Sequence, residues 1–391
     1  MSVTSDISRK WLHIATILGI AAIVRVIAAN ILPDQGSLLP DAAIYRESAR
    51  QLFSDFKLTT SFQMPLYSTL IGIIGPGPMQ LAADIALSVL TVWLVYALSV
   101  ELFADRRAAI LAAIAAAIYP PLIFFAVVGL SETLFITLIL AAFLCWYRAH
   151  FTFAAIFAVL AILTRPIFDL AAPALVVFFA LVVHRNTLGQ TARHLLVYAI
   201  TYCALMSAWW FHNYRSYGQF VRLTPGFGTV LYAGNNPLNK SGGGNAGVDY
   251  DTGGFQNFTN PIERDRALRE AAIAYILDHP KRFFELAGLK FIRMWRLWPA
   301  HEGYSNLSTV LISIVAFVPV LLLSALGLFY SRRELRRLSP ILLFGLGYTA
   351  VHMVLIGTIR YRLPLEPFLL IFAGLAASRL IALHAPTHGR S

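Results

Sequence analysis

The chain has 391 residues, of which 58% are hydrophobic and only 13% are charged. This composition excludes an ordinary soluble domain and is typical of a polytopic membrane protein. The formal net charge is +11, from 31 Lys and Arg against 20 Asp and Glu. Because the arginines gather in short loops between apolar stretches, the charge indicates membrane topology, and no nucleic-acid partner is expected.

Ten apolar stretches are predicted to cross the membrane as helices, since about 20 apolar residues span its hydrocarbon layer. They are 11–31, 79–102, 108–127, 131–148, 151–164, 166–184, 195–213, 307–330, 339–357 and 363–383, and the fifth is the shortest. The basic residues that flank them fall on one side if both termini are cytoplasmic, as the positive-inside rule requires. These residues are Arg9, Lys10, Arg106, Arg107, Arg148, Arg185, Arg193, Arg332, Arg333, Arg336 and Arg337.

This topology predicts three parts in an all-α membrane protein. Residues 1–213 form an N-terminal transmembrane module with a first outer loop at 32–78, residues 214–306 form a small extracytoplasmic subdomain, and residues 307–391 form C-terminal transmembrane helices. The two outer segments are expected to face away from the cytoplasm.

The outer subdomain contains two predicted helices. Asn260 and Pro261 are typical of a capped helix start, and the helix that follows ends before His279-Pro280. A second, aromatic-rich helix is expected from Lys281 to about Trp298. Residues 225–254 are rich in Gly and Asn without periodicity, so they are expected to form a loop.

Asp41 lies in the first outer loop, in a segment whose apolar residues follow helical spacing. The segment is expected to lie on the membrane surface with Asp41 in the first turn of a helix and Tyr45 one turn later. An acidic residue there stabilises a helix N-terminus. The functional alternative is a general base that takes a proton from an acceptor hydroxyl or amine.

Ser131 and Glu132 open the fourth predicted span from the outer side. Ser131 would cap that helix while Glu132 complements its dipole. Alternatively, a carboxylate at membrane depth marks a functional interior that contains a cationic partner.

Several arginines depart from the positive-inside pattern. Arg165, Arg215, Arg360 and Arg362 lie at the outer ends of spans, and Arg25 lies in the outer half of the first span. Each one alone is explained as an interfacial anchor whose charged end reaches water. Together, guanidinium groups on that face would bind a phosphate or diphosphate through bidentate hydrogen bonds.

Asn235 and Asn236 occur in an outer loop, where such residues form ordinary turns. Sugar recognition through amide hydrogen bonds is the competing interpretation. The histidines, among them His212, are too scattered to predict a metal site. Cys145 and Cys203 lie in apolar runs without ligand spacing, so no zinc site or disulfide framework is predicted.

Eight short motifs occur in an order that resembles bacterial GT-C glycosyltransferases, in the branch similar to protein O-mannosyltransferases and aminoarabinose transferases. They are Asp41-x-x-x-Tyr-x-x-x-Ala, Pro65-Leu-Tyr, Ser131-Glu, Thr164-Arg-Pro, Trp210-Phe-His-Asn-Tyr-Arg-Ser-Tyr-Gly-Gln-Phe-Val, Gly234-Asn-Asn-Pro, His279-Pro and Arg360-Tyr-Arg-Leu-Pro-Leu-Glu-Pro. The resemblance extends over about residues 20–375. His212 stands where relatives hold an arginine, and Ala42 stands where many relatives hold a second acid.

The resemblance implies a membrane enzyme with a GT-C fold that moves a hexosyl or pentosyl group from a polyprenyl-phosphate donor to a lipid, glycan or protein acceptor. Asp41 would be the base, and Arg165, Arg360 and Arg362 would bind the donor phosphate. Inversion at the anomeric carbon is expected, with no cofactor and no metal predicted because arginines neutralise the leaving phosphate. The supporting residues would be Tyr45, Glu132, Arg25, Arg215, His212, Asn235 and Asn236.

Two other classes of function use the same features. A transporter or flippase for an anionic lipid or solute would bind its cargo with these arginines and carry out no chemistry. The absence of a visible internal repeat disfavours transporters that are built from inverted repeats. A non-catalytic scaffold would bind cell-wall glycan through the outer subdomain.

Overall fold

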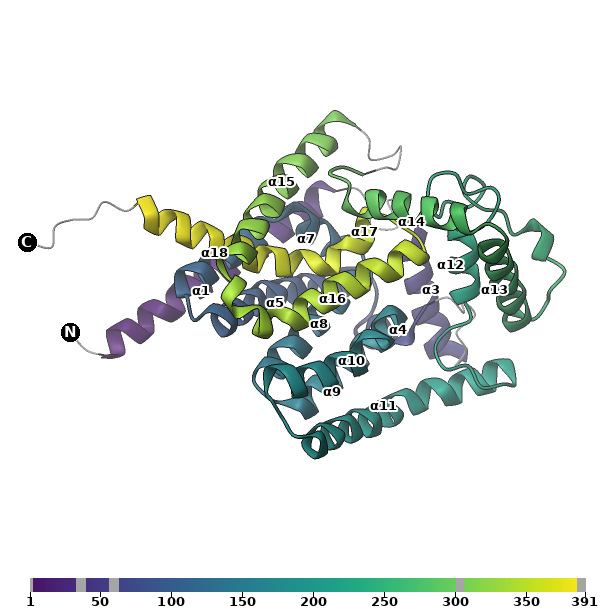
Figure 1. Cartoon of the computed structure of the whole chain (residues 1–391), viewed down its shortest axis with the longest axis horizontal. Helices are drawn as coiled ribbons and strands as arrows, with labels where there is room; N and C mark the ends of the chain where they lie inside the picture. Colours follow the sequence, from purple (N-terminus) through teal and green to yellow (C-terminus); the bar gives the residue numbers. More distant parts are fainter. Residues whose placement is uncertain (1–2, 33–39, 56–62, 300–305, 385–391) are drawn as a thin grey trace, which may run out of the picture.

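The computed structural model describes residues 3–32, 40–55, 63–299 and 306–384. Within these ranges the regular elements are all helices, as predicted (Figure 1). The α-helices are α1 (Val3–Ile31), α3 (Pro40–Asp55), α4 (Pro65–Ile74), α5 (Pro78–Phe103), α6 (Arg106–Ile118), α7 (Pro120–Phe125), α8 (Glu132–Tyr147), α9 (Phe151–Thr164), α10 (Ala171–Phe178), α11 (Leu188–Tyr217), α12 (Phe227–Gly234), α13 (Pro261–Asp278), α14 (Pro280–Trp295), α15 (Leu307–Tyr330), α16 (Leu335–Val354), α17 (Ile359–Arg362) and α18 (Glu366–His384).

Seven helical segments are long and apolar enough to cross a membrane, and they match seven of the ten predicted spans. They are Leu12–Ile31, Pro78–Phe103, Pro166–Val183, Leu188–Tyr217, Leu307–Tyr330, Arg332–Val354 and Ile359–His384. The chain is therefore a polytopic, all-α membrane protein.

The remaining three predicted spans are not among these seven long helices, although the span 151–164 forms helix α9 with the predicted bounds. The predicted helix 108–127 is interrupted at Tyr119, because two prolines follow and the residue before a proline is driven out of the helical conformation. Helices α8 and α9 have 16 and 14 residues. Almost every residue of α8 is buried, so this helix lies inside the protein and has little contact with lipid.

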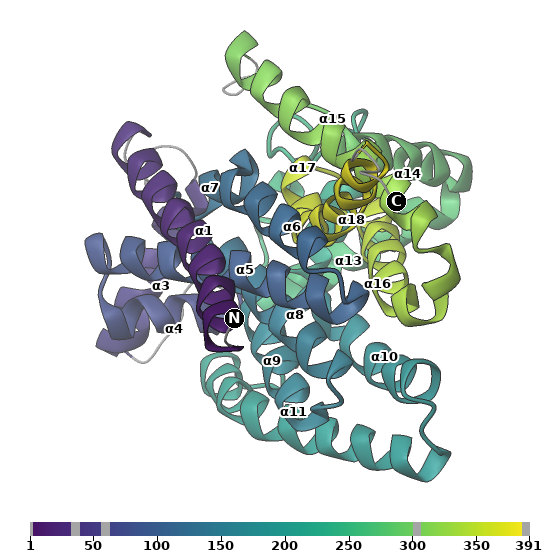
Figure 2. The ribbon, with the colours of Figure 1, turned by 90° about the vertical axis from the view of Figure 1, so that its left-hand side faces the viewer.

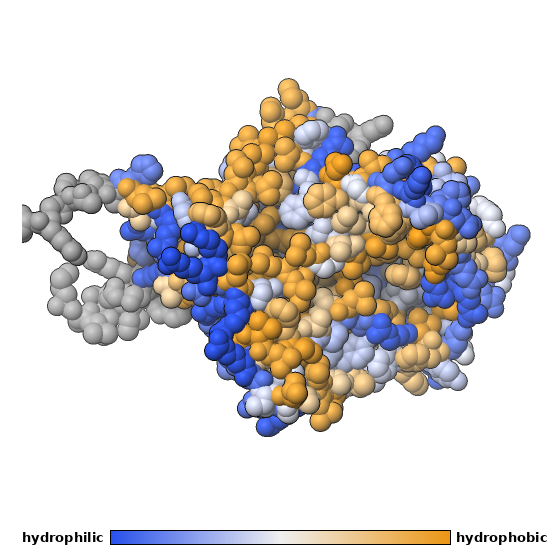
Figure 3. All heavy atoms as spheres, in the orientation of Figure 1, coloured by the Kyte–Doolittle hydropathy of each residue, from blue (hydrophilic) through white to orange (hydrophobic). Residues whose placement is uncertain are grey.

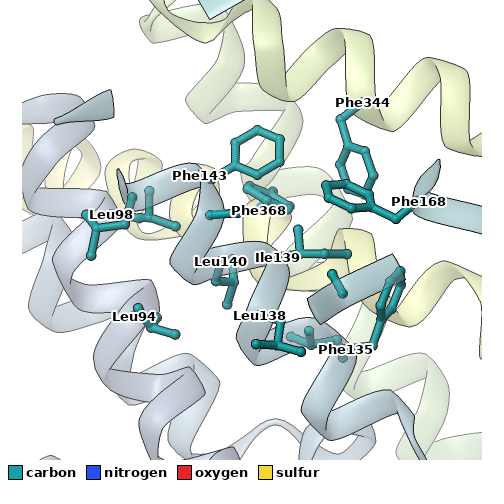
Figure 4. Close-up of a cluster of buried hydrophobic side chains, with 14 of the residues drawn as sticks. Leu94, Leu98, Phe135, Leu138, Ile139, Leu140, Phe143, Phe168, Phe344 and Phe368 are labelled. Carbon is teal, nitrogen blue, oxygen red and sulfur yellow. The ribbon is translucent and has the colours of Figure 1, made fainter. Parts of the chain in front are cut away.

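The buried face of α8 organises the core. Phe135, Ile139 and Phe143 point into a cluster with Phe344 of α16 and Phe368 of α18 (Figure 4). The rings of Phe143 and Phe368 meet with centroids 4.9 Å apart. Such close packing fixes α8 among its neighbours, and this in turn fixes the position of Glu132 at its first turn.

The two ends of the molecule differ in composition. The start of α1 and the end of α18 lie at one end of the long axis, while α3 and α12–α14 lie toward the other end (Figure 1). The end view separates α3 and α4 from α13 and α14 across the helical core (Figure 2). Hydrophobic residues cover the middle of the visible face, and hydrophilic residues gather near both ends (Figure 3). This arrangement is typical of a protein that crosses a bilayer along its long axis.

Residues 214–299, within the predicted outer subdomain, contain the two helices that the sequence predicts, together with a third. The side chain of Asn260 caps α13 by accepting a hydrogen bond from the Ile262 amide, as expected. The prediction of a continuous loop over 225–254 is wrong in part, because residues 227–234 form α12. Helix α12 packs on α13 where Gly228 leaves no space for a side chain against the Asp265 carbonyl. That backbone contact depends on tertiary structure.

Candidate active site

Helix α3 carries Asp41 in its first turn, in agreement with the sequence prediction. The helix is tied to the core by Tyr45, whose hydroxyl shares a hydrogen bond of 2.8 Å with the Ser131 hydroxyl. The Tyr45 ring also meets Tyr67 of α4 edge-on, with centroids 5.0 Å apart. Burial raises the pKa of Tyr45, so its hydroxyl keeps its proton. These contacts hold Asp41 beside the N-terminus of α8.

Glu132 begins α8, and its carboxylate is 1% exposed. The capping explanation of Ser131 is wrong, because Ser131 makes no side-chain cap and bonds to Tyr45 instead. Two guanidinium groups meet Glu132: Arg165 Nη1 lies 2.6 Å from Oε1, and Arg360 Nε donates to the same oxygen. A carboxylate at this depth therefore has the cationic partners that the alternative prediction requires.

Asp41 completes a group of four charged residues, here called the outer charge cluster: Asp41, Glu132, Arg165 and Arg360. The Arg360 guanidinium joins both carboxylates, since its Nη1 donates to Asp41 Oδ2 at 2.6 Å. Two arginines and two acids give the cluster a net charge of zero when all four are ionised. Its members come from α3, α8, the end of α9 and α17, which are far apart in the sequence.

Exposure changes in steps across the cluster. The side chains are 1% exposed at Glu132, 17% at Arg165, 23% at Arg360 and 43% at Asp41. Glu132 Oε2 is buried and has no hydrogen-bond partner among the described residues. A guanidinium has five N–H groups, so Arg165 keeps donor capacity for another acceptor beside its Nη1 contact with Glu132 Oε1.

Aromatic rings surround the arginines and lead to an apolar cavity. The Arg165 guanidinium lies over the rings of Phe135 and Tyr361, 5.9 and 5.8 Å from their centroids. Tyr361 stacks on His352 at 4.4 Å, and His352 contacts Tyr348 at 4.8 Å. Tyr348 also lines a half-open cavity of about 160 Å³ between α10 and α16, whose other walls are mainly aliphatic. A ligand with a charged group and an apolar chain would find both environments here.

Arg362 lies in a different environment from the outer charge cluster. Its Nε donates to Glu366 Oε1 at 2.7 Å, and its Nη1 donates to the carbonyls of Met294 and Arg296. The guanidinium also lies over the Phe317 ring, 3.5 Å from its centroid. This buried set of contacts joins α17 to α14, α15 and α18, so the side chain does not face the site where Arg165 and Arg360 meet.

The remaining arginines are also separate from the cluster. Arg25 is fully buried and donates to Ser88 Oγ and to the carbonyls of Ala21 and Ala117, which joins α1 to α5 and α6. Arg215 is exposed at the end of α11, over the ring of Phe211.

His212 lies on α11, and the two loop amides lie in the loop that follows α12. The His212 ring stacks on Trp209 with centroids 5.0 Å apart. Asn235 and Asn236 are both fully buried, and their amide nitrogens donate to main-chain carbonyls. Neither amide therefore faces a ligand in this structure.

The sequence interpretation assigned no role to two residues that the structure brings out, Tyr361 and Lys290. Tyr361 lies between two predicted arginines and forms the aromatic floor beneath Arg165. Lys290 is fully buried. Its spacing from Leu286 and Met294, four residues on each side, places it on the buried face of α14, and this pattern is visible in the sequence.

Among the described residues, no group of three or more His, Cys, Asp or Glu side chains is arranged to hold a metal ion. The two acids of the outer charge cluster already pair with arginines.

No protein-family model and no curated protein matches the chain. Solved structures of an archaeal oligosaccharyltransferase from Archaeoglobus fulgidus are similar to it. The AglB complex with an inhibitory peptide and a dolichol-phosphate has a TM-score of 0.53 and 15% identity, covering 98% of this chain and 53% of that one. The apo form gives 0.55 and 15%, covering 95% and 51%. The complex with Zn and sulfate gives 0.53 and 16%, covering 94% and 49%.

The chain thus spans about half the length of the solved structures that it matches. At 15% identity the likeness shows a shared fold, which is the GT-C type predicted from the sequence.

Proposed function

We propose that this protein is an integral membrane glycosyltransferase that takes a sugar from a polyprenyl-phosphate donor. The observation that carries the proposal is the outer charge cluster, in which Asp41 lies 2.6 Å from Arg360 and both arginines converge on the buried Glu132. A base and a pair of phosphate-binding groups in contact are what transfer of a phosphate-linked sugar needs.

Arg165 and Arg360 are proposed to bind the donor phosphate. Arginine presents paired N–H groups that match phosphate oxygens, and the guanidinium of Arg165 has further N–H groups beside the Nη1 that meets Glu132. Glu132 would keep the guanidinium groups aligned while the phosphate binds. Arg362 is assigned a supporting role, because it holds α17 and therefore the chain that carries Arg360.

The apolar cavity beside the cluster supports a lipid-linked donor. A cavity between α10 and α16 with mainly aliphatic walls suits a hydrocarbon chain, and the Tyr348, His352 and Tyr361 rings connect it to Arg165. The similar archaeal structure was solved with a dolichol-phosphate and a peptide. We therefore propose that the donor of this protein is likewise a phosphate attached to an isoprenoid chain.

In the proposed step, Asp41 accepts the proton of an acceptor hydroxyl or amine. The freed electron pair of the acceptor forms a bond to the anomeric carbon, and the bond from that carbon to the phosphate oxygen breaks. The bonding pair stays on the departing polyprenyl phosphate, where Arg165 and Arg360 stabilise the growing negative charge. Attack opposite the leaving group inverts the anomeric carbon.

The ion pair between Asp41 and Arg360 must change when the donor binds. The phosphate is proposed to take over Arg360 from Asp41, which neutralises the guanidinium and frees the carboxylate as a base. No metal is needed in this scheme because the arginines supply the positive charge. The site is proposed to lie at the periplasmic or exterior face of a bacterial inner membrane. The proposed acceptor is a lipid, a glycan or a protein.

Mass spectrometry of the lipid that co-purifies with the protein tests this proposal. We expect an isoprenoid phosphate, with or without its sugar, to accompany the wild-type protein in detergent. The Arg165→Ala and Arg360→Ala double variant should lose it, whereas Arg215→Ala, an exposed arginine outside the cluster, should retain it. If the lipid crossed proteoliposomes without forming a glycosyl product, the protein would be a transporter instead.

A further inference from the structure

Lys290 is a buried amine with an unusual set of partners. Its side chain is fully buried on α14, and its Nζ donates to Asn235 Oδ1 and to the Val354 carbonyl, both at 3.0 Å. The described residues contain no ion pair to Lys290, so neutral acceptors satisfy it. A neutral amine has two N–H groups for these two acceptors, whereas an ammonium would leave its third N–H without a partner. Burial lowers the pKa of Lys290 to about 7, in the direction that this geometry favours.

The two acceptors join three helices at one point. Asn235 follows the end of α12, and Val354 is the last residue of α16. Asn235 Nδ2 also donates to the Val354 carbonyl, at 2.9 Å. One carbonyl at the end of α16 therefore receives a hydrogen bond from the outer loop and another from α14.

The same face of α14 holds the segment that follows Val354. A methyl group on Gly357 would overlap the main chain of Lys290, so this segment passes directly over the lysine backbone. Arg293 Nε donates to the Gly357 carbonyl, and the Gly357 amide donates to Gly242, each at 3.3 Å. Arg360 lies three residues beyond Gly357, so the position of its guanidinium depends on how this segment is held.

We propose that Lys290 is a positioning residue that fixes the chain entering α17 and thereby aligns Arg360 for the phosphate of the donor. This inference rests on the proposed function of Arg360. The link is physical: a buried donor is costly unless it is hydrogen-bonded, and here its bonds go to the end of the helix that precedes Arg360. Removing the amine leaves the Val354 carbonyl with one donor in place of two.

Lys290→Met tests the proposal, because methionine fills similar space without a donor. The matched control is Lys281→Met, because Lys281 is an exposed lysine near the start of the same helix, α14. Gly357→Ala is the second variant, since it displaces the same segment and leaves Lys290 intact. Hydrogen exchange over residues 355–361 reports the position of the chain directly, with residues 188–200 of α11 as the internal reference.

Binding of farnesyl phosphate to the full-length protein in detergent gives the second measurement. We expect Lys290→Met and Gly357→Ala to raise the Kd about tenfold and to speed exchange over 355–361, while Lys281→Met changes neither. In an Arg360→Ala background, Lys290→Met should change the Kd by less than about twofold, because Lys290 affects the ligand only by positioning Arg360.

The outcomes separate the two proposals. Unchanged exchange over 355–361 in Lys290→Met overturns the positioning role, whatever the ligand result. A Kd that rises equally with and without Arg360 also overturns it, because a general loss of structure would act in both backgrounds. If Lys290→Met speeds exchange over 355–361 but the wild type does not bind farnesyl phosphate, the proposed donor class is overturned. Lys290 then remains the residue that holds Arg360.

Discussion

Arg360 and Arg362 are two residues apart on α17, yet they lie in opposite environments. Arg360 contacts two carboxylates from distant segments and is partly exposed, at 23%. Arg362 is buried against Glu366, two carbonyls and an aromatic ring. An arginine at the predicted outer end of a span is therefore not, by its position in the sequence alone, a residue that binds a ligand. An exposed guanidinium that a ligand can reach is suited to function, and an enclosed one is suited to holding helices together.

Arg360→Ala gives the largest expected effect and tests the functional half of this comparison. We expect transfer from a polyprenyl-phosphate sugar to fall by about 10²- to 10³-fold, because a group that stabilises the leaving phosphate is removed. The melting temperature should change little, since Arg165 still pairs with Glu132. Transfer assays with the purified protein measure the first effect, with Arg215→Ala as the matched control. Full transfer in Arg360→Ala would remove this residue from the site.

Asp41→Asn is expected to lower transfer by about 10²-fold, because the amide cannot accept the proton of the acceptor. Donor binding should be unchanged or tighter, since the carboxylate that competes for Arg360 has been neutralised. Separate measurements of farnesyl phosphate affinity and transfer rate distinguish the two effects. An otherwise intact Asp41→Asn protein with wild-type transfer would show that the base lies elsewhere.

Arg362→Met should affect stability where Arg360→Ala affects activity. Removing one partner of a buried ion pair leaves Glu366 uncompensated, and such changes cost about 3 kcal/mol or more. Thermal unfolding in detergent should show a clear fall in melting temperature, while the Kd for farnesyl phosphate rises much less than in Arg360→Ala, because Arg362 holds α17 without meeting the phosphate. A Kd that rises as much as in Arg360→Ala would instead support the sequence prediction that all three arginines bind the phosphate.

The smallest expected effect is a pH dependence that Lys290 gives to stability. Its pKa is about 7 in the folded protein and near 10.5 when the chain is unfolded. Between these values the unfolded chain binds more protons, so the lysine makes a contribution that increases stability as the pH rises from 7 towards 10. In the described structure its Nζ donates to two neutral oxygens, Asn235 Oδ1 and the Val354 carbonyl. The melting temperature of the wild type should therefore rise relative to that of Lys290→Met between pH 7 and pH 10; a difference that stays constant with pH would contradict the assignment.

Periodic and compositional features of the chain were predicted well. Seven spans, the helix that carries Asp41 and the capped helix α13 follow from hydrophobic length, helical spacing and the Asn260-Pro261 start, which are local signals. The two errors have different causes, one local and one tertiary. Tyr119 breaks a predicted span because of the prolines that follow it, and α12 forms in a Gly- and Asn-rich stretch because it packs on α13.

The sequence by itself determined an all-α polytopic membrane protein and the small set of acids and arginines from which a site had to be built. Tertiary structure alone decided which of them meet. Asp41, Glu132, Arg165 and Arg360 come together from four separate segments, whereas Arg362, Arg25 and the two loop amides turn into the framework. Span lengths and helix starts depend on neighbours in the chain, but an ion pair between residues 41 and 360 depends on how the helices from α4 to α16 pack.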